Sequence, residues 1–214
     1  MKWTYGDSWE KFPIETGQVW GLADGSQVAV HDIFNSLPDF VRADLVFVDP
    51  PWNQGNLRSF YTKAEIDPEP ENGFDKFSSV LLERIRQIGA QTAYIEMGNQ
   101  AAVMFQASLE RQFKYVQHWP VLYYKKHSTN ILRGSNIAPI DYDFTGIDEA
   151  KCIQIIAKIE QYEVIADPCM GRGLVGLAAY ANGKPFVATE LNKRRLAVLL
   201  DRLSSAGADV KRLK

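Results

Sequence analysis

The chain contains few of the residues that build a disulfide framework, a metal site or a membrane span. Its 214 residues include two cysteines, Cys152 and Cys169, which form no CxxC pattern, so we expect reduced thiols in a cytoplasmic protein. The three histidines, His31, His118 and His127, have no metal-ligand spacing, and we predict no metal. No run approaches the roughly 18 consecutive apolar residues that a membrane span needs.

The chain also lacks a strong net charge and a recognisable targeting segment. Its formal net charge is −2, so binding of nucleic acid would depend on a local basic patch. Residues 1–9 mix polar and aromatic side chains, unlike an export signal. Hydrophobic residues make up 46% of the chain, and this composition and length predict one globular domain over residues 1–214.

Apolar runs and amphipathic stretches alternate along the chain. This order favours an α/β fold with a parallel sheet covered by helices on both faces, and ligands then lie beyond the carboxyl ends of the strands. Residues 53–77 are expected to form a mobile loop, and residues 125–145 to be polar and irregular. Strands are expected at 27–33, 45–48, 92–97, 115–124, 164–166 and 186–189, and helices at 34–40, 78–88, 99–112, 148–159, 174–182 and 193–204.

A glycine-rich turn joins the expected strand 164–166 to the helix that follows it. Gly171 and Gly173 let the backbone turn tightly and approach a ligand. The helix N-terminus offers free N–H groups to a carboxylate. Glu190, which ends the next strand, can accept hydrogen bonds from two ribose hydroxyls. We therefore predict a cofactor site formed by Asp167, Pro168, Gly171, Gly173 and Glu190.

The same glycines leave other interpretations open. With Gly176 they match GxGxxG, the turn of nicotinamide-binding folds. That turn normally opens the first strand–helix unit, whereas here it lies close to the last residue of the sequence. A tight turn whose glycines serve only packing is the other alternative.

A second turn, Asp49-Pro50-Pro51-Trp52, follows the apolar run 45–48. Two consecutive prolines fix φ and supply no N–H, so they build a rigid turn with free carbonyls. The Asp49 carboxylate and the Pro50 carbonyl can hold both hydrogens of an amino group and direct its lone pair towards a methyl donor. Trp52 offers a flat face for stacking a base. We predict that these four residues are catalytic; the alternative is a strand-terminating turn with a surface tryptophan.

Together the two motifs resemble those of the DNA and RNA amino-methyltransferases, which carry a D/N/S-P-P-Y/F/W catalytic motif and a D-P-F-x-G-x-G cofactor motif. The catalytic motif comes first here, as in the group called beta. The resemblance implies a Rossmann-like, S-adenosylmethionine-dependent methyltransferase fold with a permuted motif order. It also implies a mostly parallel seven-stranded sheet, whose antiparallel strand could be 115–124, and S-adenosyl-L-methionine as cofactor.

Two further positions extend the resemblance. Asp32, after His31, resembles the acidic strand end that lies near the adenine of the cofactor. Lys151 resembles the lysine of a "K-P" segment ahead of the cofactor strand, although Cys152 replaces the proline. The Asp-first motif favours adenine N6 in DNA as the target. RNA adenosine, cytosine N4, a catalytically silent binding subunit and a nicotinamide-dependent oxidoreductase remain alternatives.

Two groups of basic and aromatic residues are candidates for contact with nucleic acid. Such mixtures suit phosphate binding and base stacking, although each group could also be an ordinary solvated surface. The segment 125–145 is short for a target-recognition region, which favours loose specificity or a homodimer partner that completes the site. The predicted nucleic-acid-binding residues are Tyr123, Lys125, Lys126, His127 and Arg133, with Arg58 in the loop after Trp52, where Tyr61 and Lys63 belong to the same candidate surface.

Overall fold

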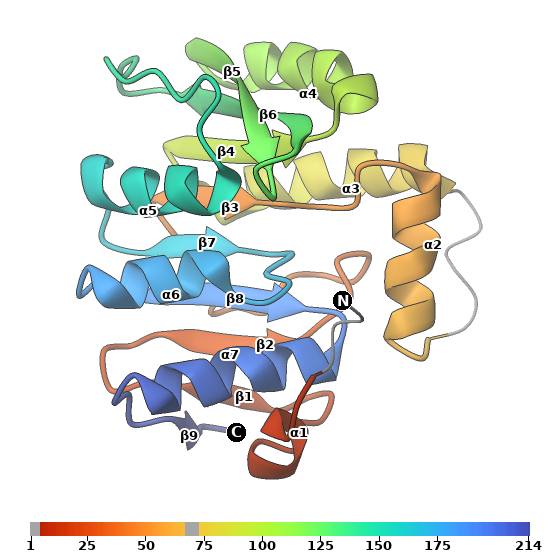
Figure 1. Cartoon of the computed structure of the whole chain (residues 1–214), viewed down its shortest axis with the longest axis vertical. Helices are drawn as coiled ribbons and strands as arrows, with labels where there is room; N and C mark the ends of the chain where they lie inside the picture. Colours follow the sequence, from red (N-terminus) through yellow and green to blue (C-terminus); the bar gives the residue numbers. More distant parts are fainter. Residues whose placement is uncertain (1–4, 67–72) are drawn as a thin grey trace.

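The protein is a single twisted sheet with helices on both faces (Figure 1). The computed structural model describes residues 5–66 and 73–214. Within these residues the sheet has nine strands in the order β5-β6-β4-β3-β7-β8-β2-β1-β9. The strands are β1 (Val19–Gly21), β2 (Gln27–Val30), β3 (Leu45–Val48), β4 (Thr92–Met97), β5 (Tyr115–Tyr123), β6 (His127–Ser135), β7 (Ile165–Asp167), β8 (Phe186–Glu190) and β9 (Lys211–Arg212). The helices are α1 (Ser8–Lys11), α2 (Gln54–Lys63), α3 (Gly73–Ile88), α4 (Asn99–Gln112), α5 (Glu149–Ile159), α6 (Leu174–Ala181) and α7 (Lys193–Ser205).

The centre of the sheet is parallel and its two sides are antiparallel. Strands β4, β3, β7, β8 and β2 pair in parallel, whereas β6 and β5 on one side and β1 and β9 on the other pair antiparallel. The predicted seven-stranded, mostly parallel sheet is therefore wrong, because the sheet is mixed and has nine strands in the described residues. The extra strands β1 and β9 have only three and two residues, too few to give a hydrophobic period.

Strand β6 lies inside the segment 125–145 that was expected to be irregular. It is buried from Thr129 to Ser135, between β5 and β4. Its polar side chains are hydrogen-bonded: Thr129 Oγ1 donates to the Met97 carbonyl (3.0 Å), and Ser135 Oγ is 2.9 Å from Thr92 Oγ1. Tertiary partners thus let a polar sequence form a buried strand. It is β6 that runs antiparallel to β4, while β5 is an edge strand that continues through Pro120.

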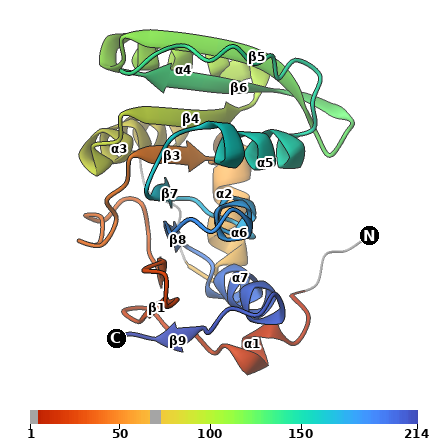
Figure 2. The same ribbon diagram turned by 90° about the vertical axis from the view of Figure 1, so that its left-hand side faces the viewer.

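Helices α5, α6 and α7 lie on one face of the sheet and α3 and α4 on the other (Figure 2). Apolar residues of α5, α6 and α7 share one core with the sheet, and those of α2, α3 and α4 share the other. The expected helices and strands other than 34–40 are confirmed; 45–48, 92–97 and 99–112 have the expected boundaries, and the boundaries of the others are shifted. No described helix is both long and apolar enough to cross a membrane.

Two local predictions between β2 and α3 are wrong. Much of the expected loop 53–77 is helix, because the Asn53 side chain accepts a hydrogen bond from the Asn56 N–H and caps α2; residues 67–72 lie outside the described residues. The expected helix 34–40 is a series of turns. Asp32 Oδ1 accepts the Phe34 N–H at 3.0 Å, a local bond that competes with a helix, and Pro38 interrupts the segment.

Candidate active site

Both sequence motifs line one pocket at the carboxyl edge of the parallel strands. Asp49 follows β3, Asp167 ends β7 and Glu190 ends β8, and all three contribute to its wall. Helix α2 stands across this edge of the sheet (Figure 1). The pocket therefore lies where an α/β sheet normally binds its ligand.

The glycine-rich turn is held in shape by Glu190. This buried carboxylate accepts the Gly171 N–H through Oε2 at 2.7 Å and the Asn192 N–H through Oε1 at 2.8 Å. Gly171 has φ +54°, and a Cβ there would meet nothing within 4 Å, so its backbone borders open pocket space. Gly173 begins α6 with φ +75°, and a Cβ there would lie 2.5 Å from Leu199 Cδ1. Glycine is required at Gly173 for both conformation and packing.

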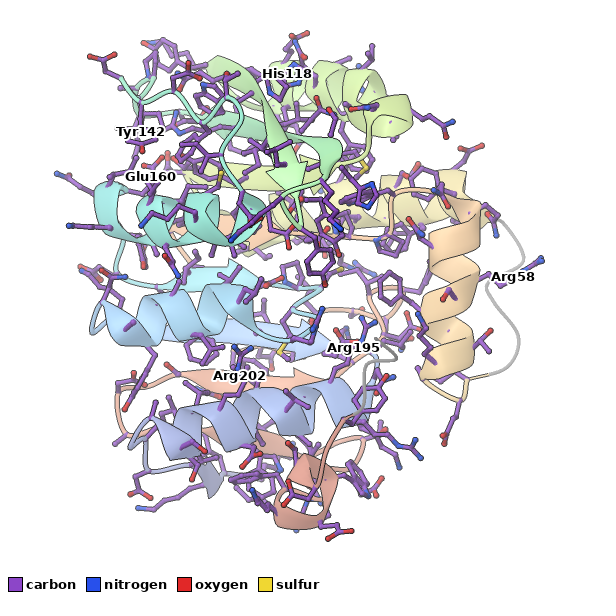
Figure 3. All side chains as sticks on the ribbon, viewed as in Figure 1. Arg58, His118, Tyr142, Glu160, Arg195 and Arg202 are labelled. Atoms are coloured by element: carbon purple, nitrogen blue, oxygen red, sulfur yellow. The ribbon has the colours of Figure 1, made fainter. Side chains whose placement is uncertain are left out.

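Three contacts attach helix α2 to the side of the pocket where the cofactor site was predicted, named the cofactor side below. The Tyr61 hydroxyl donates to Asp32 Oδ1 at 2.8 Å. Asn192 Nδ2 donates to the Lys63 carbonyl at 2.7 Å. The Arg195 guanidinium lies 4.4 Å from the centre of the Phe60 ring, and Figure 3 shows Arg195 between the sheet and α2. Asp32, the residue predicted near the cofactor adenine, thus lies in the wall beneath α2.

The proline turn directs Asp49 into the pocket. Trp52 Nε1 donates to Asp49 Oδ1 at 3.0 Å, and the Trp52 ring packs edge-on against Tyr123 with centroids 4.8 Å apart. Asp49 and Pro51 line the pocket, whereas Trp52 borders a smaller neighbouring hollow with Asn99. In this geometry Trp52 orients the Asp49 carboxylate, and Tyr123 supplies an aromatic side chain to the pocket wall.

The carboxyl groups of Glu96 and Glu149 line the same pocket as Asp49 and form a cluster with it. Burial raises the pKa of Asp49 to about 7, opposed by the Trp52 hydrogen bond and by the charge of Arg195. Burial and the nearby Asp49 charge raise the pKa of Glu96 to about 10 and that of Glu149 to about 7. Since like charges resist joint ionisation, part of this cluster is neutral at pH 7.

On the cofactor side, the carboxyl groups of Asp167 and Glu190 accept hydrogen bonds from backbone N–H groups. Burial raises the pKa of Asp167 well above its ordinary value, although Oδ1 accepts the Cys169 N–H at 3.2 Å. Burial also raises the pKa of Glu190, opposed by the charge of Arg195 and by backbone N–H groups. This side of the pocket therefore combines buried acids with backbone donors.

The loop between β5 and β6 brings four of the predicted nucleic-acid-binding residues to the pocket edge. Tyr123 and Tyr124 line the pocket, and Lys125, Lys126 and His127 are exposed beside them. Tyr124 and Lys125 have φ +49° and +58°, an uncommon conformation for residues other than glycine. The Tyr124 hydroxyl accepts a hydrogen bond from Arg172 of the glycine-rich turn, so this tip and the cofactor turn are in contact.

Three predicted residues lie elsewhere. Arg133 is 2% exposed, and its Nε donates to Glu160 Oε1 at 2.7 Å; Glu160 lies at the end of the sheet opposite α2 (Figure 3). Arg133 is therefore a buried structural residue, and its assignment to nucleic-acid contact is wrong, because no solvent-facing charge remains. Lys151 is exposed on α5 and Arg58 on the outer side of α2, and neither lines the pocket.

Several pocket residues were missed by the sequence analysis. Glu96 carried a signal, because it is the one charged residue in the apolar strand 92–97. Glu149 resembled an ordinary acidic residue in a first helical turn. Tyr61 was assigned to a candidate nucleic-acid surface and not to this pocket, to which the packing of α2 brings both Phe60 and Tyr61. Arg195, in α7, gave no local signal.

Solved structures share this architecture, although no protein-family model and no curated protein sequence matches the chain. The complex of M1.HpyAVI with SAM superposes with a TM-score of 0.57 at 15% identity, covering 82% of this chain and 98% of the other. TTHA0409 from Thermus thermophilus, also with S-adenosyl-L-methionine, gives a TM-score of 0.55 at 15% identity over 83% and 93% of the two chains. The cytosine-N4-specific PvuII DNA methyltransferase gives a TM-score of 0.55 at 10% identity, covering 86% of this chain and 89% of the other. The fold is that of DNA methyltransferases.

Proposed function

We propose that the protein transfers a methyl group from S-adenosyl-L-methionine to an exocyclic amino group of a nucleic-acid base, with adenine N6 in DNA as the target. One observation carries this proposal: the Asp49 turn and the Gly171–Glu190 cofactor turn, which are far apart in sequence, line a single pocket. The fold shared with DNA methyltransferases supports it. Fold alone does not define a function, so the site carries the argument.

The residues present fit the proposed cofactor. The open space beside Gly171 and the N-terminus of α6 suit the amino-acid end, where backbone N–H groups favour a carboxylate. Glu190 keeps free lone pairs for ribose hydroxyls, because a carboxylate can accept about four hydrogen bonds. Asp32 and His31 border the pocket below α2, where an adenine would lie. When bound, the cofactor supplies a methyl group already activated on a sulfonium.

Asp49 positions the target amino group. Trp52 occupies one carboxylate oxygen, Oδ1, and leaves Oδ2 as the acceptor for an amino hydrogen. Hydrogen bonding to an acceptor increases the electron density on the nitrogen and holds it in a reactive orientation. The ionised form of Asp49 is the better acceptor, so the rate should rise with pH through about 7.

The target base and polymer are proposed on separate grounds. Adenine is favoured by the Asp-first motif, and cytosine N4 is the second candidate because PvuII DNA methyltransferase, a cytosine-N4 enzyme, shares the fold.

In a duplex, the base must leave the stack to reach Asp49. We assign phosphate contacts to Lys125, Lys126 and His127 because these basic side chains are exposed at the β5–β6 tip. A second copy of the chain could complete the site. Sedimentation with and without DNA would test that dimer.

The test is transfer of label from S-adenosylmethionine to matched unmethylated DNA and RNA, followed by nucleoside separation. We expect N6-methyladenine from DNA. Asp49→Ala should lower single-turnover transfer by about 10²–10³-fold, the usual cost of losing a key hydrogen-bonding group, with cofactor binding by calorimetry retained. Asp39→Ala, at an exposed acidic position, is the matched control. Label in RNA only would show that the substrate is RNA and not DNA. Label in neither polymer would contradict the proposed function.

A further inference from the structure

The floor of the pocket contains two buried carboxyl oxygens without a partner. Glu96 is 1% exposed and Glu149 is 5% exposed, and both line the pocket. Among the described residues, no hydrogen bond reaches Glu96 Oε1 or Glu149 Oε2. Buried polar atoms are nearly always paired, so two free oxygens in one pocket indicate that a ligand or a proton completes them.

The fold brings these two residues to Asp49 from separate elements. Val48 of β3 pairs with Ile95 of β4, so Asp49 and Glu96 are the next neighbours across the parallel strands. Glu149 is the first residue of α5, whose start is bound to β5 because Leu122 N–H donates to the Ile147 carbonyl at 2.9 Å. All three side chains line the one pocket, where the Asp49 charge raises the pKa of both glutamates.

Methylation of an amino group requires a place for one proton. The nitrogen lone pair forms the new N–C bond, the S–C bond breaks, and its electron pair neutralises the sulfonium. The nitrogen then carries a positive charge until one N–H proton leaves. Asp49, hydrogen-bonded to that nitrogen, is the first acceptor.

We propose, resting on the function proposed above, that Glu149 receives the amino proton from Asp49 and that Glu96 is a positioning residue, a neutral acid whose O–H holds the carboxylates in place. A proton moves readily between groups of similar pKa, and Asp49 and Glu149 both have pKa values of about 7. Glu96, with a pKa of about 10, keeps its proton at neutral pH. The net result is one methylated amine, one thioether and one proton passed to solvent.

The charged surroundings support this division of roles. The Arg172 charge and the Tyr124 backbone N–H favour ionised Glu149, whereas Glu96 faces only acidic charges. Arg195 acts on Asp49 from the cofactor side. Besides the three cluster members, the titratable and charged groups that face the cluster are Tyr123 and Tyr124 at the end of β5, Asp148 before α5, Cys152 in α5, Asp167 at the end of β7, Arg172 in the glycine-rich turn and Arg195 in α7. The neutral Trp52 donates its hydrogen bond to Asp49.

The same substitution should therefore affect the rate much more at Glu149 than at Glu96. Glu149→Gln cannot take up a proton, and we expect single-turnover methyl transfer to fall by about 10²-fold. The rising limb of its pH–rate profile should also move to lower pH, because one negative charge beside Asp49 is removed. Glu96→Gln keeps a neutral hydrogen-bond donor, so it should lower the rate less than Glu149→Gln does and should leave the rising limb where it is in wild type. Glu163→Gln, at an exposed position, is the control.

A second readout does not depend on activity. Infrared difference spectra of wild type minus Glu96→Gln at pH 8 should show the carbonyl stretch of a protonated carboxyl. A wild-type rate together with an unchanged pH limb in Glu149→Gln would overturn the proton transfer. For Glu96, a larger loss of rate in Glu96→Gln than in Glu149→Gln, or absence of that infrared band, would overturn the positioning role. Each of these results leaves methylation by the wild type intact, whereas a wild type that labels no nucleic acid would overturn the proposed function itself.

Discussion

The two halves of the pocket are built on different principles. On the cofactor side, backbone hydrogen bonds hold the turn: Glu190 binds two N–H groups, and the Thr189 hydroxyl donates to the Pro168 carbonyl at 2.9 Å. On the carboxyl side, Asp49 has one bond from Trp52, while Glu96 and Glu149 each leave an oxygen unpaired. The cofactor side maintains a shape, whereas the carboxyl side keeps hydrogen-bonding capacity for a substrate.

The comparison predicts that the cofactor side is sensitive to shape and the carboxyl side to charge. A change of backbone conformation should be most harmful at the glycine-rich turn. A change that preserves shape but alters protonation should be most visible at the carboxyl cluster. The following substitutions separate these two kinds of sensitivity.

The largest effect is expected from Gly173→Ala. Its positive φ costs about 1–2 kcal/mol for any other residue, and the new Cβ would overlap the buried Leu199 side chain, adding about 1–3 kcal/mol. Gly183→Ala is the matched control, because Gly183 has φ +65° and free space around its Cβ position. Urea unfolding should show the larger loss of stability for Gly173→Ala. Equal losses would mean that packing at this turn is not tight.

The next effect concerns the bonds that hold the turn. Glu190→Ala removes acceptors for two backbone N–H groups, each worth about 1.5–3 kcal/mol when the acceptor is charged. We expect S-adenosylmethionine to bind at least about tenfold more weakly by calorimetry. Glu190→Gln keeps one acceptor oxygen and should fall between wild type and Glu190→Ala. Undiminished affinity in Glu190→Ala would show that the turn keeps its shape without this carboxylate.

A smaller effect is expected in the pH dependence of stability. Asp49 and Glu149 have folded pKa values of about 7, above their unfolded values of about 4. The folded state therefore binds more protons between pH 4 and 7, and these groups make stability fall as pH rises through that window. Urea unfolding at several pH values should show a shallower fall in Glu149→Gln than in wild type. An identical slope in both proteins would contradict the raised pKa of Glu149.

The smallest effect is expected at the tip above the pocket. Lys126 is exposed beside the strained residues Tyr124 and Lys125. Lys126→Ala should weaken DNA binding uniformly across sequences and reduce the salt slope by about 1, with stability changed by less than about 0.5 kcal/mol. Fluorescence anisotropy at several salt concentrations measures this. A slope equal to that of wild type would remove Lys126 from the interface.

Local patterns predicted the parts of the fold that local interactions control. The apolar run 45–48 predicted β3, and the glycines before α6 predicted a tight turn there, because strand burial and positive φ are readable from neighbouring residues. Strand β6 was missed because Thr129 and Ser135 depend on partners in β4 to become buried. Arg133 appeared basic and exposed for the same reason, since its partner Glu160 is 27 residues away.

The sequence by itself determined the alternation of strands and helices and the two turns that contain Asp49 and Gly173. Periodicity, proline and glycine act over a few residues, so their consequences need no distant partner. Only the tertiary structure decided which carboxyl groups meet Asp49. That meeting depends on the register of β3 with β4 and on the attachment of α5 to β5, which are set by packing across the whole sheet.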